Sequence, residues 1–322
     1  MKRTPLLSVA VSPHIHDGSS VSEIYLHQFF ALLPAAVGGL LVWGAGGLRT
    51  LLLALGSAVV IEWISGRMMK RETSLANGSI LAQGLMLGML LHASAPIWLI
   101  VVAAAIMVVM GKQIFGGLGA YPVNPLMLAM AFLLVSWPAR LNLAQQMTNT
   151  VKDFPMIEPL VAWRGFGAGA ADAYSVPGML MGQQLSGVGS TAIILLCLGG
   201  IYLAIRGFIA WRITVSYLVS MFVVAMLFNL GSSEIYPTPI FHLASGIAVF
   251  AAFFIATDFT TAPVNPWAQV IYGAGCGILT ILFRTFGIFP DGTVFAIILM
   301  NLVNPLVDRI CPKVISVEVP VR

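Results

Sequence analysis

The stretch GKQIFGGLGAYPVNP, residues 111–125, is a first candidate for chemistry because it gathers glycine, proline and amide side chains between two apolar segments. Glycine permits backbone conformations closed to other residues and a close approach to a flat ligand; the glycines in question are Gly116, Gly117 and Gly119. Asn124 precedes Pro125, which suits the first turn of a helix that Asn124 can cap. Two interpretations remain open, a tight membrane re-entry turn and a cofactor cradle. The spacing is not GxGxxG in a βαβ unit, which excludes a Rossmann nucleotide site.

A second polar stretch, ATDFTTAPVNPWAQ at residues 256–269, follows a long apolar run. Asp258 stands at the end of that run and is followed by Thr260 and Thr261. A carboxylate at a membrane edge with hydroxyl neighbours can take part in ion or proton entry. It can equally be a solvated helix cap. We therefore treat these three residues as candidates for an ion path, with capping as the alternative.

Other polar residues at membrane depth are isolated. Glu62 and Arg284 lie in apolar segments, where buried charges are expensive and indicate function, but both are near predicted helix ends and could snorkel to water. The histidines show no ligand spacing and are expected to be hydrogen-bonded at helix ends; these are His27, His92 and His242. Cys197, Cys276 and Cys311 form no CxxC pattern, so neither a metal site nor a catalytic set is predicted.

Composition fixes the environment of these groups. The chain has 322 residues, of which 59% are hydrophobic and 9% charged, whereas soluble domains are about 25% charged. The surrounding solvent must therefore be largely lipid. The net charge of +4 fits the cationic bias of cytoplasmic membrane loops, and a nucleic-acid role would need a dense Lys/Arg run.

Ten apolar segments predict an all-α polytopic membrane protein. They cover residues 24–45, 48–66, 80–95, 96–112, 125–138, 190–210, 213–232, 239–257, 268–286 and 291–307. With a cytoplasmic N-terminus, the cytoplasmic side receives eleven of the sixteen Lys and Arg residues, and the even number of segments places both termini there.

The predicted organisation is two five-helix halves separated by a loop. The divisions are a cytoplasmic N-terminal segment (1–23), a first half (24–138), a periplasmic loop (139–189), a second half (190–307) and a cytoplasmic tail (308–322). An odd number of spans in each half would invert one half relative to the other. The motif PVNP occurs at 122–125 and 263–266, in both cases at a cytoplasmic junction, and indicates a reused turn rather than inversion.

Several blocks in order resemble the RnfD/NqrB family, membrane subunits of the ion-pumping Rnf (ferredoxin:NAD) and Nqr (NADH:quinone) complexes. They are SPHIH (12–16), GKQIFGGLGAYPVNPLML (111–128), FHLASG with FFIATDFTTAP (241–263), and FPDGTVFAIILMN with NPLVDR (289–309). The resemblance covers nearly the whole chain. The SPHIH start, the short length and the FPDG block look more like RnfD than NqrB.

This resemblance implies about ten transmembrane helices in two inverted halves, similar to urea-transporter-like channels, with several helices short or broken. It implies a bacterial inner-membrane subunit of an Rnf-type complex, which couples electron transfer between ferredoxin and NAD to Na⁺ or H⁺ translocation and has no complete reaction in one subunit. The implied partners are RnfA, RnfB, RnfC, RnfE and RnfG. The alternative is a flavin-free channel, transporter or scaffold that has lost an electron-carrying role.

The resemblance also implies two flavins. A non-covalent riboflavin within the membrane would lie around the glycines of 111–125 and Asn124. An FMN would be esterified to a threonine in a periplasmic pattern like D-G-x-S-x-A-T. In the matching stretch Asp172 and Ser175 fit this pattern, but Gly178 stands at the threonine position and has no oxygen to esterify.

Covalent FMN is therefore predicted to be absent at Gly178. Mass spectrometry or in-gel flavin fluorescence of the isolated polypeptide should find no covalently retained flavin. Flavin that survives denaturation on the polypeptide would show this prediction to be wrong.

Overall fold

The computed structural model describes residues 20–70, 77–141, 155–190 and 192–310, and the regular elements in these ranges are all helical. The SPHIH block, Cys311 and most of the C-terminal tail lie outside the described residues. Three helices are long and apolar enough to cross a membrane: α1 (Val21–Met68), α10 (Trp211–Gly231) and α13 (Pro266–Phe286). Together with the composition, they confirm the prediction of a helical membrane protein.

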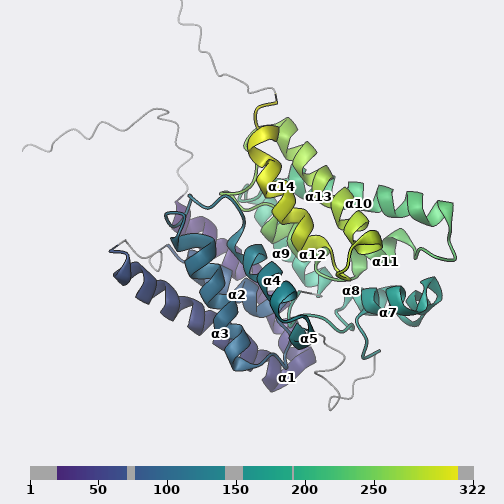
Figure 1. The fold of residues 1–322 in the computed structure, drawn as a ribbon, viewed down its shortest axis with the longest axis horizontal. Coiled ribbons are helices and arrows are strands. Elements are labelled where there is room, and N and C mark those ends of the chain that lie inside the picture. Colours follow the sequence, from purple (N-terminus) through teal and green to yellow (C-terminus); the bar gives the residue numbers. More distant parts are fainter. Residues whose placement is uncertain (1–19, 71–76, 142–154, 191, 311–322) are drawn as a thin grey trace, which may run out of the picture.

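Shorter helices complete the bundle, and each of the ten predicted segments contains helix. The apolar ones are α2 (Ser79–Leu90), α3 (Ile97–Ala105), α4 (Pro125–Ser136), α9 (Ile193–Ile205) and α14 (Thr293–Val307). The remaining elements are η1 (Ile106–Gln113), α5 (Pro138–Leu141), α7 (Pro159–Phe166), η2 (Ala168–Ala173), α8 (Val176–Leu180), α11 (Pro239–Ala244), α12 (Ala248–Phe250) and η3 (Ala251–Ile255). Figure 1 shows α2 and α3 on one side of the molecule and α10, α13 and α14 on the other.

Glycine interrupts the helices at two places. The segments 24–45 and 48–66 form the two arms of α1, which kinks sharply at Gly44, where φ is 58° and ψ is −136°. The segment 239–257, predicted as one span, contains α11 and α12, which are separated at Gly246, where φ is 67°. The apolar pattern predicted the division of α1 near Gly44 but not the break at Gly246, because a glycine in the left-handed region interrupts a helix without lowering its apolar content.

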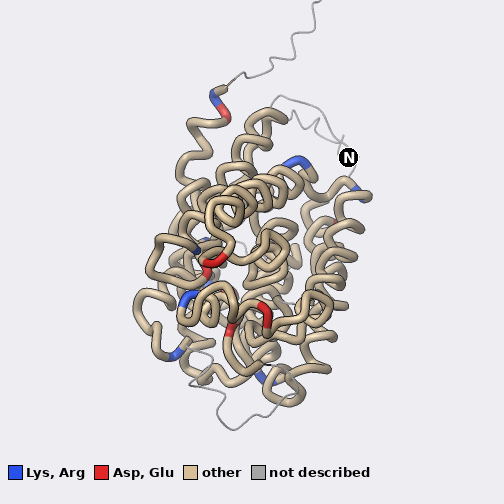
Figure 2. Tube along the Cα trace, turned by 90° about the vertical axis from the view of Figure 1, so that its right-hand side faces the viewer, with Lys and Arg blue, Asp and Glu red and all other residues tan. Residues whose placement is uncertain are grey.

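The described junctions fall into two groups, connected by helices that run from one to the other. Asn124 contacts Asp258, and Asn304 donates to the carbonyl of Thr261, which joins the junctions at 111–125, 256–266 and 304–310. In the second group, hydrogen bonds join His92 to Arg140, Gln184 to Ala244, and Arg164 to Ile288. Figure 2 shows how few charged residues lie along the described trace. These contacts join junctions that are far apart in the sequence, and the side of the membrane on which each junction lies stays a prediction.

Small residues let α10 and α13 approach closely. Gly273 and Gly277, four residues apart on α13, lie against Ser216 and Ser220 on α10, and a Cβ on either glycine would collide with backbone atoms of α10. This small-xxx-small arrangement is a common way for membrane helices to gain van der Waals contact in the absence of a hydrophobic driving force. Gly275, on the same helix, differs because its Cβ would meet only the flexible end of Met300.

We expect Gly277→Ala to lower the free energy of unfolding by about 1–3 kcal/mol, because the added methyl must push α10 away from α13. Gly275→Ala is the matched control and should cost less than about 1 kcal/mol, since Met300 can change its rotamer. Thermal unfolding of the detergent-purified variants measures both. Equal destabilisation by the two substitutions would contradict the close approach of the helices.

Candidate functional site

The polar junctions at 111–125 and 256–266 meet in space around the carboxylate of Asp258. The Asn124 Nδ2 donates to Oδ2 of Asp258 at 3.4 Å, and the Tyr121 hydroxyl donates to Oδ1 at 3.5 Å. The hydroxyl of Thr261 donates to Oδ2 at 3.4 Å. All three distances are at the long end of the hydrogen-bond range, and the backbone N–H of Thr260 donates to the same carboxylate.

Local sequence explains why these groups converge. The π-helical segments η1 and η3 lead into the two junctions, and each junction ends in PVNP at the start of the next helix, α4 or α13. The Asn124 Oδ1 accepts hydrogen bonds from the backbone N–H groups of Leu126 and Met127, so Asn124 caps α4 as predicted. Its amide nitrogen remains available for Asp258. The Asn124 side chain thus accepts hydrogen bonds from the start of α4 through its oxygen and donates one to Asp258 through its nitrogen.

The glycines of this junction shape its backbone. Gly116, Gly117 and Gly119 have φ values of 124°, 96° and 91°, conformations that L side chains rarely adopt. No atom lies within 4 Å of a Cβ built on Gly117 or Gly119, so conformation rather than a close neighbour explains glycine at those two positions. This favours the interpretation of residues 111–125 as a tight re-entry turn, and the cofactor cradle remains a prediction. Thr260, the other predicted ion-path residue, is half-buried beside Asp258.

Next to this junction, Glu62 on α1 and Lys112 on η1 form a buried ion pair. Lys112 Nζ lies 3.2 Å from Glu62 Oε1 and also donates to the Ser79 hydroxyl at 3.4 Å. Both charged side chains are almost completely buried, at 0% and 1% exposure. The interpretation that Glu62 snorkels to water is therefore wrong, because the chain supplies a cation at the same depth.

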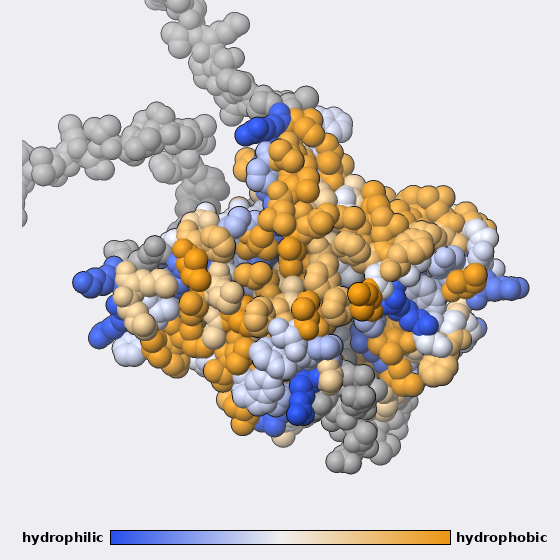
Figure 3. All heavy atoms as spheres, viewed as in Figure 1, coloured by the Kyte–Doolittle hydropathy of each residue, from blue (hydrophilic) through white to orange (hydrophobic). Residues whose placement is uncertain are grey.

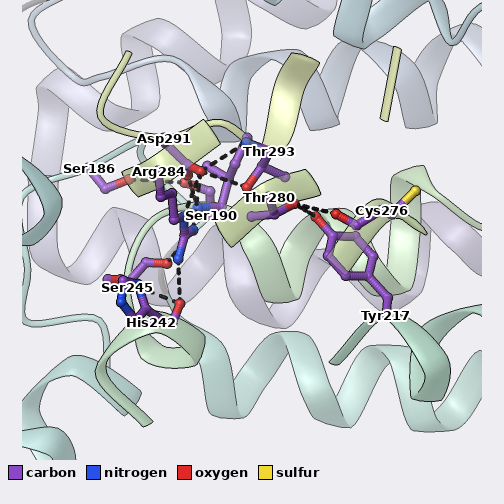
Figure 4. Close-up of polar contacts among 11 residues, drawn as sticks. Ser186, Ser190, Tyr217, His242, Ser245, Cys276, Thr280, Arg284, Asp291 and Thr293 are labelled. Atoms are coloured by element: carbon purple, nitrogen blue, oxygen red, sulfur yellow. Dashed lines mark hydrogen bonds and ion pairs between the residues drawn. The ribbon is translucent and has the colours of Figure 1, made fainter. Parts of the chain in front are cut away.

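Arg284 is also fully buried, which excludes snorkelling for it as well. Its guanidinium donates to the carbonyl oxygens of His242 and Ser245 and to the carboxylate of Asp291 (Figure 4). Asp291 in turn accepts from the backbone N–H of Ile247. These bonds satisfy the backbone where α11 ends and α12 begins, so this cluster positions a broken helix.

The predicted flavin-attachment motif lies on the opposite side of the molecule from Asp258. Ser175 caps α8 by accepting from the N–H of Gly178, and a Cβ on Gly178 would lie 2.7 Å from the Ser175 hydroxyl and 3.1 Å from the Gln183 amide oxygen. Asp172 lines a groove of about 550 Å³ together with Glu234. The ends of the Ser175 and Gln183 side chains would have to move to admit a side chain at position 178.

A smaller cavity, about 110 Å³, lies between the two halves and is lined by His92, Glu158 and Asp291 among apolar groups. Burial and the negative charge of Asp291 raise the pKa of Glu158 to about 7. The cavity can hold water around these polar side chains.

Two of the three histidines are hydrogen-bonded, as expected from the sequence. His27 Nδ1 and the Tyr202 hydroxyl are 2.5 Å apart, and His92 bonds the Ser94 hydroxyl and the carbonyl of Arg140. Among the described residues, Nδ1 of His242 has no hydrogen-bond partner, and the ring packs edge-on against Trp163. No group of three or more metal-binding side chains occurs in the described part of the chain.

Sequence reasoning missed three of the polar residues that the structure brings together. Tyr121 belongs to the junction already singled out, where its proximity to PVNP is a usable signal. Lys112 ends an apolar run and can be matched with Glu62 as two charges at membrane depth. Asp291 occurs in the FPDG block, which contributes to the family resemblance but gives no local sign of an arginine partner.

Comparison with known proteins places the chain in a family. The sequence profile described as the NQR2, RnfD, RnfE family matches residues 8–316. The chain belongs to this family. It is 34% identical to the D subunit of the Na⁺-translocating ferredoxin:NAD⁺ oxidoreductase complex of Acetobacterium woodii over 310 residues, 94% of this chain and 93% of that protein.

Two further relatives cover the chain to the same extent. The D subunit of the proton-translocating ferredoxin:NAD⁺ oxidoreductase complex of Clostridium ljungdahlii is 32% identical over 314 residues, 94% of both chains. The D subunit of the ion-translocating oxidoreductase complex of Pectobacterium atrosepticum is 31% identical over 335 residues, 93% of this chain and 95% of that protein. The resemblance to RnfD is thus confirmed.

The buried ion pair gives a prediction for stability. Lys112→Met leaves Glu62 buried without its closest cation and should lower the free energy of unfolding by about 3–5 kcal/mol. Adding Glu62→Gln to this variant removes the buried negative charge and should recover most of the loss. Thermal unfolding in detergent measures both variants. A double variant that is less stable than the single one would contradict this electrostatic explanation.

Proposed function

We propose that this chain is the D subunit of an Rnf-type complex, which couples electron transfer between ferredoxin and NAD to translocation of Na⁺ or H⁺ across the bacterial inner membrane. The names of its relatives support this assignment, because they are called D subunits of ferredoxin:NAD or ion-translocating oxidoreductase complexes and match over more than 90% of both chains. The partners would be RnfA, RnfB, RnfC, RnfE and RnfG, and no complete reaction would take place in this polypeptide alone.

We further propose that the Asp258 junction holds a non-covalent riboflavin. The observation that supports it most is the convergence of an amide, a phenol and a carboxylate from two separate junctions, at loose distances from one another. The polar edge of an isoalloxazine ring needs both donors and acceptors, while the rest of the ring suits an apolar bundle. Bound riboflavin would supply one-electron redox chemistry.

In this proposal the residues of the junction have distinct tasks. Asn124 and Tyr121, which donate to Asp258, would hold the ring edge, the first through its amide N–H and the second through a hydroxyl that can donate or accept. The turn built by the three glycines keeps side chains away from the approach to the site. Asp258 and the hydroxyls of Thr260 and Thr261 offer oxygen ligands to the coupling ion, in keeping with the predicted ion path.

Covalent FMN does not fit the residues present. Gly178 offers no hydroxyl to which a phosphate could be esterified, and the ends of the Ser175 and Gln183 side chains lie close to where its Cβ would be. We therefore propose that this chain departs from the FMN-carrying pattern implied by the resemblance. The same departure favours the alternative, a flavin-free protein that acts as a channel or scaffold, and the flavin content of the protein separates the two.

For the architecture we propose ten spans in two inverted halves with both termini in the cytoplasm, as in urea-transporter-like channels. The ten helical segments support this layout. So does the alternation of α4, α13 and α14 between the two groups of junctions. The described part of residues 139–189, which contains α7, η2 and α8, would then cover the periplasmic face.

The riboflavin proposal is tested by Asn124→Ala, which should reduce riboflavin content in the purified complex several-fold because it removes an amide donor from the site. The matched control is Asn265→Ala. Asn265 stands at the same position of the second PVNP and caps α13, but its amide donates to the carbonyl of Ile310.

Each substitution removes one helix cap, at a cost of about 1 kcal/mol, so a general loss of stability would affect both variants alike. Riboflavin that is lost only in Asn124→Ala supports the proposal. Unchanged riboflavin in Asn124→Ala, or an equal loss in both variants, would remove its basis.

A further inference from the structure

An apolar groove of about 450 Å³ runs along α14, beside the end of α13 and the loop that joins the two helices. Its wall is made of Phe283, Ile288, Phe289, Phe295, Ile298, Leu299 and Leu302. Several of these side chains are strongly exposed, with Ile288 at 90% and Leu302 at 60%. Figure 3 shows hydrophobic side chains covering the face of the molecule that includes α14.

One end of this groove carries a cation. Arg164, an exposed residue of α7, donates to the backbone carbonyls of Gly287 and Ile288, which line the groove. Its guanidinium has further N–H donors, and among the described residues no carboxylate lies within ion-pair distance of it. Phe166, on the same short helix, is 75% exposed, as expected for a helix lying at a membrane surface.

The length of the groove matches one leaflet of a bilayer. It extends from Gly292, just before α14, to Leu302, and these ten steps of helix rise by about 15 Å. The hydrocarbon core of a membrane is about 30 Å thick, so the groove reaches from a polar edge to the midplane. A transmembrane helix of a partner would be expected to contact a surface along its full length, whereas a phospholipid acyl chain ends at this depth.

We propose that this groove binds an anionic phospholipid, with one acyl chain lying between α13 and α14 and the headgroup phosphate on Arg164. Apolar burial of the chain supplies affinity for any phospholipid of suitable length. The single arginine supplies preference for a headgroup with net negative charge, because a zwitterionic headgroup brings its own cation to the same place.

Native mass spectrometry of the full-length chain in detergent tests this proposal, with phosphatidylglycerol and phosphatidylcholine of identical acyl chains as probes. The unmodified chain should bind phosphatidylglycerol about five-fold more tightly. Arg164→Gln should abolish this preference but keep binding of both lipids. Arg140→Gln, an exposed arginine of α5 outside the groove, should leave the preference intact.

Leu299→Trp, which fills the groove, should weaken the binding of both lipids by a similar factor. Equal binding of the two lipids to the unmodified chain, or a preference that survives Arg164→Gln, would overturn the proposal. A photo-crosslinking benzophenone side chain at Leu299 in the intact complex gives an independent readout: an adduct with phospholipid supports the proposal, and an adduct with another polypeptide overturns it.

Discussion

A helix that is interrupted inside a membrane leaves backbone groups without partners, and the organisation of this chain follows from how those groups are satisfied. Arg284 donates to the two carbonyls at the end of α11, and Asp291 accepts from the N–H at the start of α12. In the first half, Arg49 donates to the carbonyls of Ala93 and Ala95 between α2 and α3. Arginine suits this task because its donors are fixed in a planar fork and it keeps its charge when buried.

Apart from the helix breaks that Arg284, Asp291 and Arg49 stabilise, much of the irregular backbone lies at the junctions that meet around Asp258. The π-helical turns of η1 and η3 and the two PVNP sequences bring a carboxylate, an amide and two hydroxyls together. Nearby, the buried Glu62–Lys112 pair holds α1 against the same junction. Arg284, Asp291 and Arg49 thus bond the backbone at helix breaks, whereas the groups around Asp258 are those for which we propose a ligand.

The helical segments and most of the polar junctions were predictable from the sequence, because hydropathy and the PVNP motif are local signals. Asn124 was predicted as a cap and is one. The break at Gly246 was not predictable from composition, since glycine is also common inside uninterrupted membrane helices. The kink at Gly44, by contrast, lies next to the predicted division between segments 24–45 and 48–66. Pairings between distant residues, such as Lys112 with Glu62, depend on how the helices pack, and one sequence without related sequences does not reveal them.

The function proposed for this chain requires flavin that is held in the membrane without a covalent bond. The most direct test is a flavin inventory of the intact complex, with each flavin assigned to one polypeptide after release under denaturing conditions. We expect riboflavin to be released from this polypeptide and no flavin to be retained on it. A polypeptide that contains no flavin, or one that keeps flavin covalently, would contradict the proposed function.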